Sequence, residues 1–214
     1  MNQPGGAVAL DVRHHRRLAT SPLLARLRAL EQHGHSRSWI VERQAELLLA
    51  EVGITEPRVP EQVIETIGLI HIRRWKGLPT SGMTSRDENG WLIVISADES
   101  EIRQRFTIFH LLGRIVADPM VDNAAARSSV NDSLDRGEQQ ASHFAACVLM
   151  PAAWIRHDWN HGLRDPRTLG RRYGVNPQGV RIRLAGLGLL DTDEEDRITE
   201  MPRHQASHDQ GGTR

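Results

Sequence analysis

Two segments decide the fold of this chain: RQRFTIFHLLGR, residues 103–114, and EQQASHFAACVLMP, residues 138–151. Apolar residues recur at helical spacing around the first segment, so we expect a helix over residues 100–117. The second segment is strongly apolar and predicts a buried helix over residues 138–150. The residues expected to face inward on the first helix are Ile102, Phe106, Phe109, Leu112, Gly113 and Val116.

The sequence on either side alternates between helical and extended patterns. Upstream, Ser21-Pro22 and Ser38 are typical helix starts, and they predict helices ending at Gly34 and Gly53. We also predict a third helix from residue 60 to 68, strands at 69–75, 81–84 and 91–95, and a polar loop or short lid at 121–136. The strands predict a small, mostly antiparallel sheet with helices against one face.

The two segments together resemble the ImmA/IrrE family of zinc metallopeptidases. In that family the first helix reads roughly R-x-R-F-T-x-A-H-E-L-G-H, and the second reads E-x-x-A-N-x-F-A-A-x-L-L-M-P. The resemblance covers about residues 45–190, and its most specific parts are Phe106-Thr107, Phe144-Ala145 and Leu149-Met150-Pro151. It implies an α+β fold with a zincin-like minimal peptidase domain and a C-terminal pair of helices resembling a helix-turn-helix.

The family's HEXXH chemistry is degenerate in this chain. Two histidines one helical turn apart bind zinc with a carboxylate from another helix, and a glutamate beside the first histidine activates a water. By resemblance, His110 matches the first histidine and Glu138 the carboxylate, whereas Leu111 stands at the general base and Arg114 at the second histidine. Leucine transfers no proton, and arginine has no lone pair for a metal. His110 and Glu138 are therefore expected to be a vestigial metal site, and no catalytic residue is assigned.

Arg114 suggests what replaces the metal. A carboxylate that has lost its zinc is costly to bury, and a guanidinium can offset that cost. We expect the Arg114 guanidinium to pair with Glu138, with nitrogen and oxygen closer than about 4 Å. The alternative is that Arg114 points to solvent and Glu138 is hydrated.

Composition narrows the class of protein. Lys and Arg number 27 and Asp and Glu number 27, so the net charge gives no reason to expect a polyanionic partner. The single cysteine, Cys147, excludes an intramolecular disulfide and a multi-cysteine zinc cluster. We find no signal peptide and no apolar run long enough to span a membrane, so we expect a cytoplasmic protein without membrane contact.

Four other features have a structural and a functional interpretation. His143 is expected to make a structural hydrogen bond, and Cys147 to be a buried apolar residue and not a nucleophile. His157 and His161 imitate a zinc motif, but their polar flanks favour chance spacing. Residues 165–187 have helix-turn-helix spacing around Gly174-Val175 and many arginines; we favour a helical pair that closes the core over one that binds DNA.

These patterns predict five regions: a disordered N-terminus at 1–18, helices at 19–56, the peptidase-like domain at 57–162, the helical pair at 163–190 and a disordered tail at 191–214. We expect no bound cofactor, although zinc is the metal that the resemblance implies. The family acts on helix-turn-helix repressors in stress responses and mobile-element induction. We therefore expect a pseudoenzyme that regulates transcription by binding a protein partner such as a repressor.

Two alternatives remain open. One is an active zinc endopeptidase whose metal is held by His110, Glu138 and a further ligand such as Asp118 or His143. The other is a DNA-binding regulator that acts through residues 165–187.

Overall fold

The computed structural model describes residues 21–30, 34–117 and 130–190, with the side chains of 130–136 excepted. The disorder expected at 1–18 and 191–214 lies outside these ranges, as does the start of the loop expected at 121–136. No helix in the described ranges is long and apolar enough to cross a bilayer.

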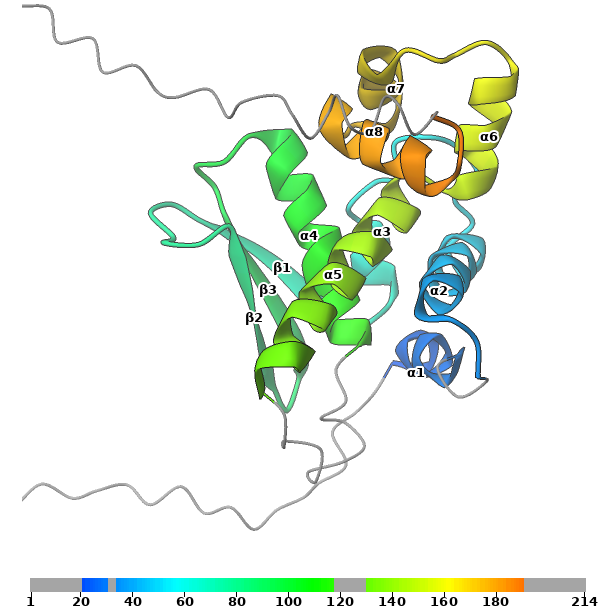
Figure 1. Cartoon of the computed structure of the whole chain (residues 1–214). Helices are drawn as coiled ribbons and strands as arrows, with labels where there is room; N and C mark the ends of the chain where they lie inside the picture. The colour runs from blue at the N-terminus through cyan, green and yellow to red at the C-terminus, as the bar shows by residue number, and fades with distance from the viewer. Residues whose placement is uncertain (1–20, 31–33, 118–129, 191–214) are drawn as a thin grey trace, which may run out of the picture.

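A three-stranded sheet forms one side of the molecule (Figure 1). Its strands are β1 (Ile70–Trp75), β2 (Gly82–Asp87) and β3 (Gly90–Ser96), in the order β1-β3-β2. β3 pairs in parallel with β1 and antiparallel with β2, so the sheet is mixed, with one pairing of each kind. The predicted α+β class and the small sheet packed on helices are confirmed, whereas the sheet is not mostly antiparallel as expected, because β1 joins β3 in parallel.

Two central helices carry the core. α4 (Glu101–Val116) packs on β2 and β3 with one face and on α5 (Val130–Leu149) with another, and α5 in turn packs on α2 (Arg37–Glu51). The layers therefore run from the sheet through α4 and α5 to α2 (Figure 1). The remaining helices are α1 (Pro22–Ala29), α3 (Val63–Thr66), α6 (Ala152–Asn160), α7 (Pro166–Tyr173) and α8 (Pro177–Gly186).

Three local expectations differ from the structure. Ile102 was expected to face inward but is exposed, because it lies in the first turn of α4 and lines a cavity instead of the core. The cap of α2 is Ser36, whose hydroxyl accepts a hydrogen bond from the backbone N–H of Trp39; Ser38 lies inside the helix. α5 begins at Val130, so the last part of the range expected to be a loop is helical.

The C-terminal pair of helices expected at 163–190 is present, and capping residues begin both helices. Asp165 caps α7 and Asn176 caps α8, each followed by proline at the first helical position. Gly174 takes a left-handed conformation, φ 66°, that only glycine adopts without strain, and it ends α7. α6, α7 and α8 sit together above the ends of α4 and α5 (Figure 1).

Candidate functional site

The centre of the site is the contact between α4 and α5, and Gly113 allows that contact to be close. A Cβ at Gly113 would lie 3.0 Å from both the Cα and the carbonyl oxygen of Ala141 on α5. His110 and Arg114 are one helical turn apart on α4 and both reach Glu138 on α5. The predicted counterparts of the zinc ligands are thus brought together by the fold.

His110 is engaged at both ring nitrogens. Its Nε2 lies 3.0 Å from Oε2 of Glu138, and its Nδ1 lies 3.2 Å from the hydroxyl of Ser142. Burial lowers the pKa of His110, and the Glu138 carboxylate opposes that shift. A neutral ring protonated on Nε2 satisfies both contacts, because it donates to Glu138 and accepts from Ser142.

The ion pair expected between Arg114 and Glu138 is present. Nε of Arg114 lies 3.3 Å from Oε1 of Glu138. The side chains are 47% and 49% exposed, so the carboxylate is not buried as expected, and water screens the pair. The guanidinium stands beside the carboxylate that a metal would need, but it contributes little to stability.

Leu111 closes the position at which a general base would stand. Its side chain is 2% exposed, and its Cδ1 would lie 2.9 Å from a Cβ built on Gly82 of β2. It is therefore packed between α4 and the edge strand. Its aliphatic side chain cannot accept a proton from a water molecule.

The described donors do not fit the zinc that the resemblance implies. A catalytic zinc takes three protein ligands, and here His110 and Glu138 supply two, because Arg114 stands at the position of the third and has no lone pair for a metal. Of the two further ligands considered, Asp118 lies outside the described residues. His143 is directed elsewhere: its Nε2 lies 3.2 Å from the hydroxyl of Ser38 on α2, which is the structural hydrogen bond predicted for it.

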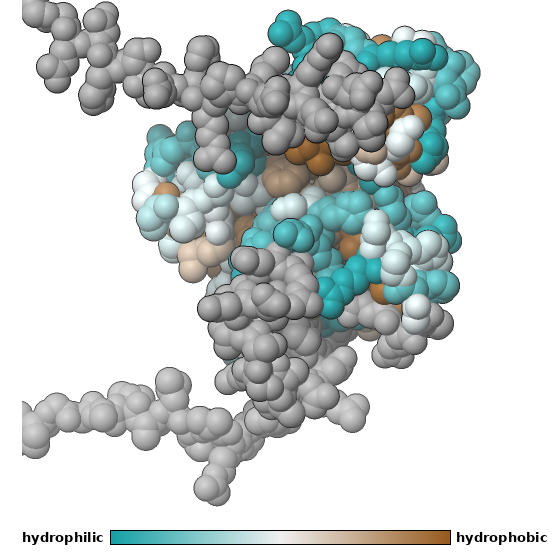
Figure 2. Space-filling model, viewed as in Figure 1, coloured by the Kyte–Doolittle hydropathy of each residue, from teal (hydrophilic) through white to brown (hydrophobic). Residues whose placement is uncertain are grey.

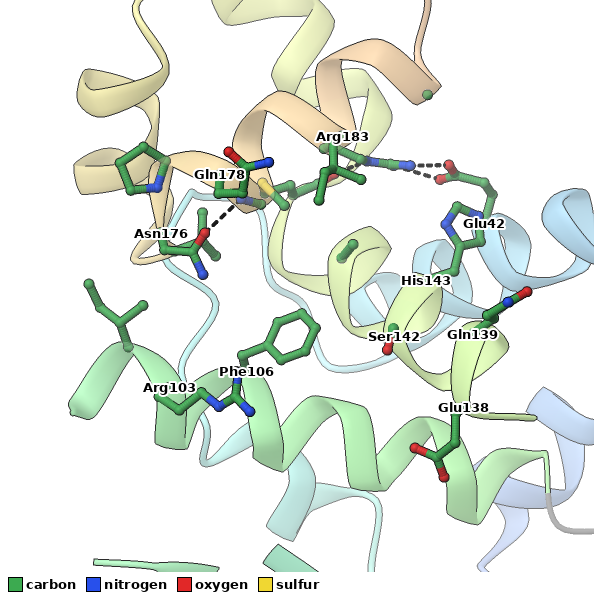
Figure 3. A pocket seen from close by; sticks show the side chains of 18 of the residues that line it. Glu42, Arg103, Phe106, Glu138, Gln139, Ser142, His143, Asn176, Gln178 and Arg183 are labelled. Atoms are coloured by element: carbon green, nitrogen blue, oxygen red, sulfur yellow. Dashed lines mark hydrogen bonds and ion pairs between the residues drawn. The ribbon is translucent and has the colours of Figure 1, made fainter. Parts of the chain in front are cut away.

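A cavity of about 1040 Å³ opens beside Glu138, the carboxylate that His110 and Arg114 contact (Figure 3). Glu138 and Ser142 lie on its wall, so the vestigial site borders it. Apolar side chains line much of it, and Figure 2 shows apolar residues in the hollow below the C-terminal helices. Its apolar lining residues include Ile102, Phe106, Ala146, Met150, Val175 and Ile182.

Two lining residues were missed by the sequence analysis. Glu42 on α2 and Arg183 on α8 form a two-pronged pair, with Nη1–Oε1 2.5 Å and Nη2–Oε2 2.9 Å (Figure 3). Arg183 is almost completely buried and also donates from Nε to the carbonyl of Met150. The partners are 141 positions apart in the chain, so no local pattern signals the contact.

Cys147, His157 and His161, which the sequence also singles out, make contacts typical of structural residues. Cys147 is buried, and burial raises the pKa of its thiol, as expected for an unreactive cysteine. The rings of His157 and His161 stack on the surface, and Nδ1 of His161 lies 2.7 Å from the carbonyl of His157. Asp158 between them points inward and accepts hydrogen bonds from Tyr173 and Arg172. Its other oxygen, Oδ1, lies 3.6 Å from Nδ1 of His157, so Asp158 contacts the pair, but its carboxylate is held in the interior by Tyr173 and Arg172.

Comparisons with known proteins agree with this architecture. Residues 70–185, more than half of the chain, match the sequence model of the IrrE N-terminal-like domain, Peptidase_M78. Among solved structures, the fold is similar to that of a Mycobacterium tuberculosis transcriptional regulator, with a TM-score of 0.55 and 18% identity. The alignment covers 76% of this chain and 51% of that chain, so the chain spans about half the length of the regulator, and the likeness concerns the fold alone. No curated protein matches the chain.

Proposed function

The chain belongs to the family of IrrE N-terminal-like domains, and from that premise we propose that it is a regulator that binds a protein partner without cleaving it. The observation that carries the proposal is the pairing of a disabled site with an open cavity. Leu111 is sealed against β2 and Arg114 is paired with Glu138, while the space beside them remains about 1040 Å³. In this proposal the protein does not hydrolyse peptides but binds its partner at the cavity.

The cavity suits a protein segment with apolar side chains. Phe106 from α4, Met150 after α5 and Ile182 from α8 line it from three sides, and Ile182 is 65% exposed. Exposed apolar surface of this kind is typical of an interaction site. By family resemblance, the partner we propose is a helix-turn-helix repressor.

The structure offers less support for binding DNA through α7 and α8. Arg172 is bonded to Asp158, and Arg183 is held by Glu42, so neither is a free cation for phosphate. Gln178 and Ile182 of α8, which would have to reach a DNA groove, line the cavity instead. Duplex binding that weakens with salt would favour this alternative.

Binding to a purified repressor from the source organism tests the cavity. Ile182→Glu should weaken the complex at least about tenfold, since a charge at an apolar contact is costly to desolvate. Met83→Glu is the matched control, because Met83 is also exposed but lies on β2, away from the cavity. Equal binding by wild type and Ile182→Glu would place the contact elsewhere.

The loss of activity needs a separate test. Purified wild-type protein, supplied with zinc, should leave the repressor intact by mass spectrometry. Cleavage that a chelator abolishes would establish the active endopeptidase instead.

Arg114→His tests whether His110, Arg114 and Glu138 occupy the family's three metal-ligand positions. The substitution would provide the missing donor one turn after His110. Measured in chains that also carry Cys147→Ser, so that no thiolate contributes, zinc affinity should rise at least about tenfold, whereas Arg114→Gln, which removes the cation without adding a donor, should not reach that gain. Leu111 needs no change for this test, because the general base is not a metal ligand. Unchanged zinc affinity in Arg114→His would contradict the mapping.

A further inference from the structure

A second group of metal-binding residue types lies on the other side of α5. Glu42 of α2 and His143 and Cys147 of α5 place one ligand atom each within 4.8 Å of one another. His143 and Cys147 are one helical turn apart, so they share a face of α5, and the carboxylate comes from the neighbouring helix. A helical pair and a carboxylate from another helix are the elements of a three-ligand metal site.

The distances suit a small divalent ion. Sγ of Cys147 lies 3.9 Å from Nδ1 and 3.7 Å from Nε2 of His143. Zinc–sulfur and zinc–nitrogen bonds of ordinary length at a tetrahedral angle separate the two ligand atoms by about 3.6 Å. The pair therefore brackets a zinc-sized volume after side-chain shifts of a few tenths of an ångström.

The residues around the cluster hold its members in place. Arg183 donates both Nη groups to Glu42, and its charge and hydrogen bond keep the pKa of Glu42 low although burial acts to raise it. Ser38 lies at Nε2 of His143, which leaves Nδ1 for a ligand. Metal-binding carboxylates and histidines are commonly held by such outer hydrogen bonds. Arg183 here takes the role of orienting a ligand, and a carboxylate oxygen retains a second lone pair for a metal.

The cluster is open on one side. Glu42 and His143 line the large cavity (Figure 3), whereas Cys147 is buried and does not line it. A metal there would keep its fourth position toward the cavity, for water or for a group of the bound partner.

The charges also balance. Binding replaces the thiol proton of Cys147 with the metal, and that proton leaves to solvent. The dication then meets one thiolate and one carboxylate, so the new unit is neutral beside the Arg183 guanidinium. No oxidant or reductant is required.

We propose that Glu42, His143 and Cys147 form a binding site for a divalent metal of the zinc type, separate from the vestigial pair of His110 and Glu138. The two sites differ in ligand chemistry, because only the proposed one contains sulfur. This difference makes them distinguishable by spectroscopy. The site does not depend on the proposed repressor binding.

Cobalt(II) added to the reduced, metal-free full chain tests the site. A thiolate ligand produces a charge-transfer absorption in the near ultraviolet, which we expect at one cobalt per chain and which zinc should displace. Cys147→Ser and His143→Ala should each weaken cobalt binding at least about tenfold, as loss of one of three ligands does. Glu138→Gln is the matched control at the vestigial site and should leave the absorption unchanged.

A wild-type measurement keeps the test independent of how the variants fold. Calorimetric titration with zinc in buffers of different ionisation enthalpy should report release of about one proton per metal, as thiol coordination requires. Absence of stoichiometric cobalt binding, or binding without the thiolate absorption and without proton release, would overturn the proposal. So would loss of the absorption in Glu138→Gln.

Discussion

The two sides of α5 carry similar groups of charged side chains that differ in how far they are buried. On one side, His110 and Arg114 of α4 meet Glu138; on the other, Arg183 meets Glu42 beside His143 and Cys147. Each is an arginine–glutamate pair with a histidine nearby. In the first, both charged side chains are about half exposed, whereas in the second Arg183 is 4% exposed and Glu42 22%.

Burial decides what each pair is worth. An exposed pair gains little because water solvates both charges when they separate. A buried pair cannot separate without leaving a charge in a poorly solvated place. We therefore expect the exposed pair of Arg114 and Glu138 to contribute little to the stability of the fold, and the buried pair of Arg183 and Glu42 to contribute more.

The largest expected effect follows from breaking the buried pair. Arg183→Met should lower the free energy of unfolding by about 3–5 kcal/mol, because it leaves the Glu42 carboxylate without its partner. Urea denaturation measures the change. The double variant Glu42→Gln, Arg183→Met removes the stranded charge and should recover part of the loss; equal losses in both would show that packing, and not charge, dominates.

A smaller loss should follow from separating the two central helices. Gly113→Ala places a methyl group 3.0 Å from the backbone of Ala141, and the resulting strain should cost about 1–3 kcal/mol. It should also disturb the contact between His110 and Glu138 while leaving the α2–α5 cluster intact. Denaturation gives the first result, and the cobalt absorption provides the second. A stabilised variant would mean that α5 moves freely to accommodate the methyl.

The two sides should also differ in their dependence on pH, by a smaller amount. Burial lowers the pKa of His143, and the charge of Arg183 lowers it further. The unfolded chain therefore binds a proton more readily than the folded protein, so stability falls as the pH drops below the ordinary histidine value of about 6.5. In metal-free protein, His143→Asn should flatten this fall in urea titrations between about pH 5 and 8. An unchanged slope would assign the effect to His110, whose pKa is also lowered by burial.

The smallest effect belongs to the exposed pair. Arg114→Gln should change the free energy of unfolding by no more than about 1 kcal/mol, since both side chains are about half exposed. The same denaturation assay measures it. A loss comparable with that of Arg183→Met would mean that exposure does not separate the two regions.

Local patterns predicted much of the fold and one half of this comparison. Apolar spacing located α4 and α5, and the helix-turn-helix spacing around Gly174-Val175 located the C-terminal helices. The pairing of Arg114 with Glu138 also followed, because the resemblance places both at one metal position. The interval between His143 and Cys147 was the one available signal of the second cluster, but a histidine and a cysteine at helical spacing are common without a metal.

The identities of Leu111 and Arg114 determined by themselves that this chain lacks a proton acceptor and a metal donor at those positions, since side-chain chemistry does not depend on the fold. Only the tertiary structure decided that Glu42 and Arg183 meet beside Cys147, and that Glu138 is half exposed. The physical reason is that solvation and long-range pairing depend on which helices pack together. Neither solvation nor long-range pairing can be predicted from the spacing of neighbouring residues.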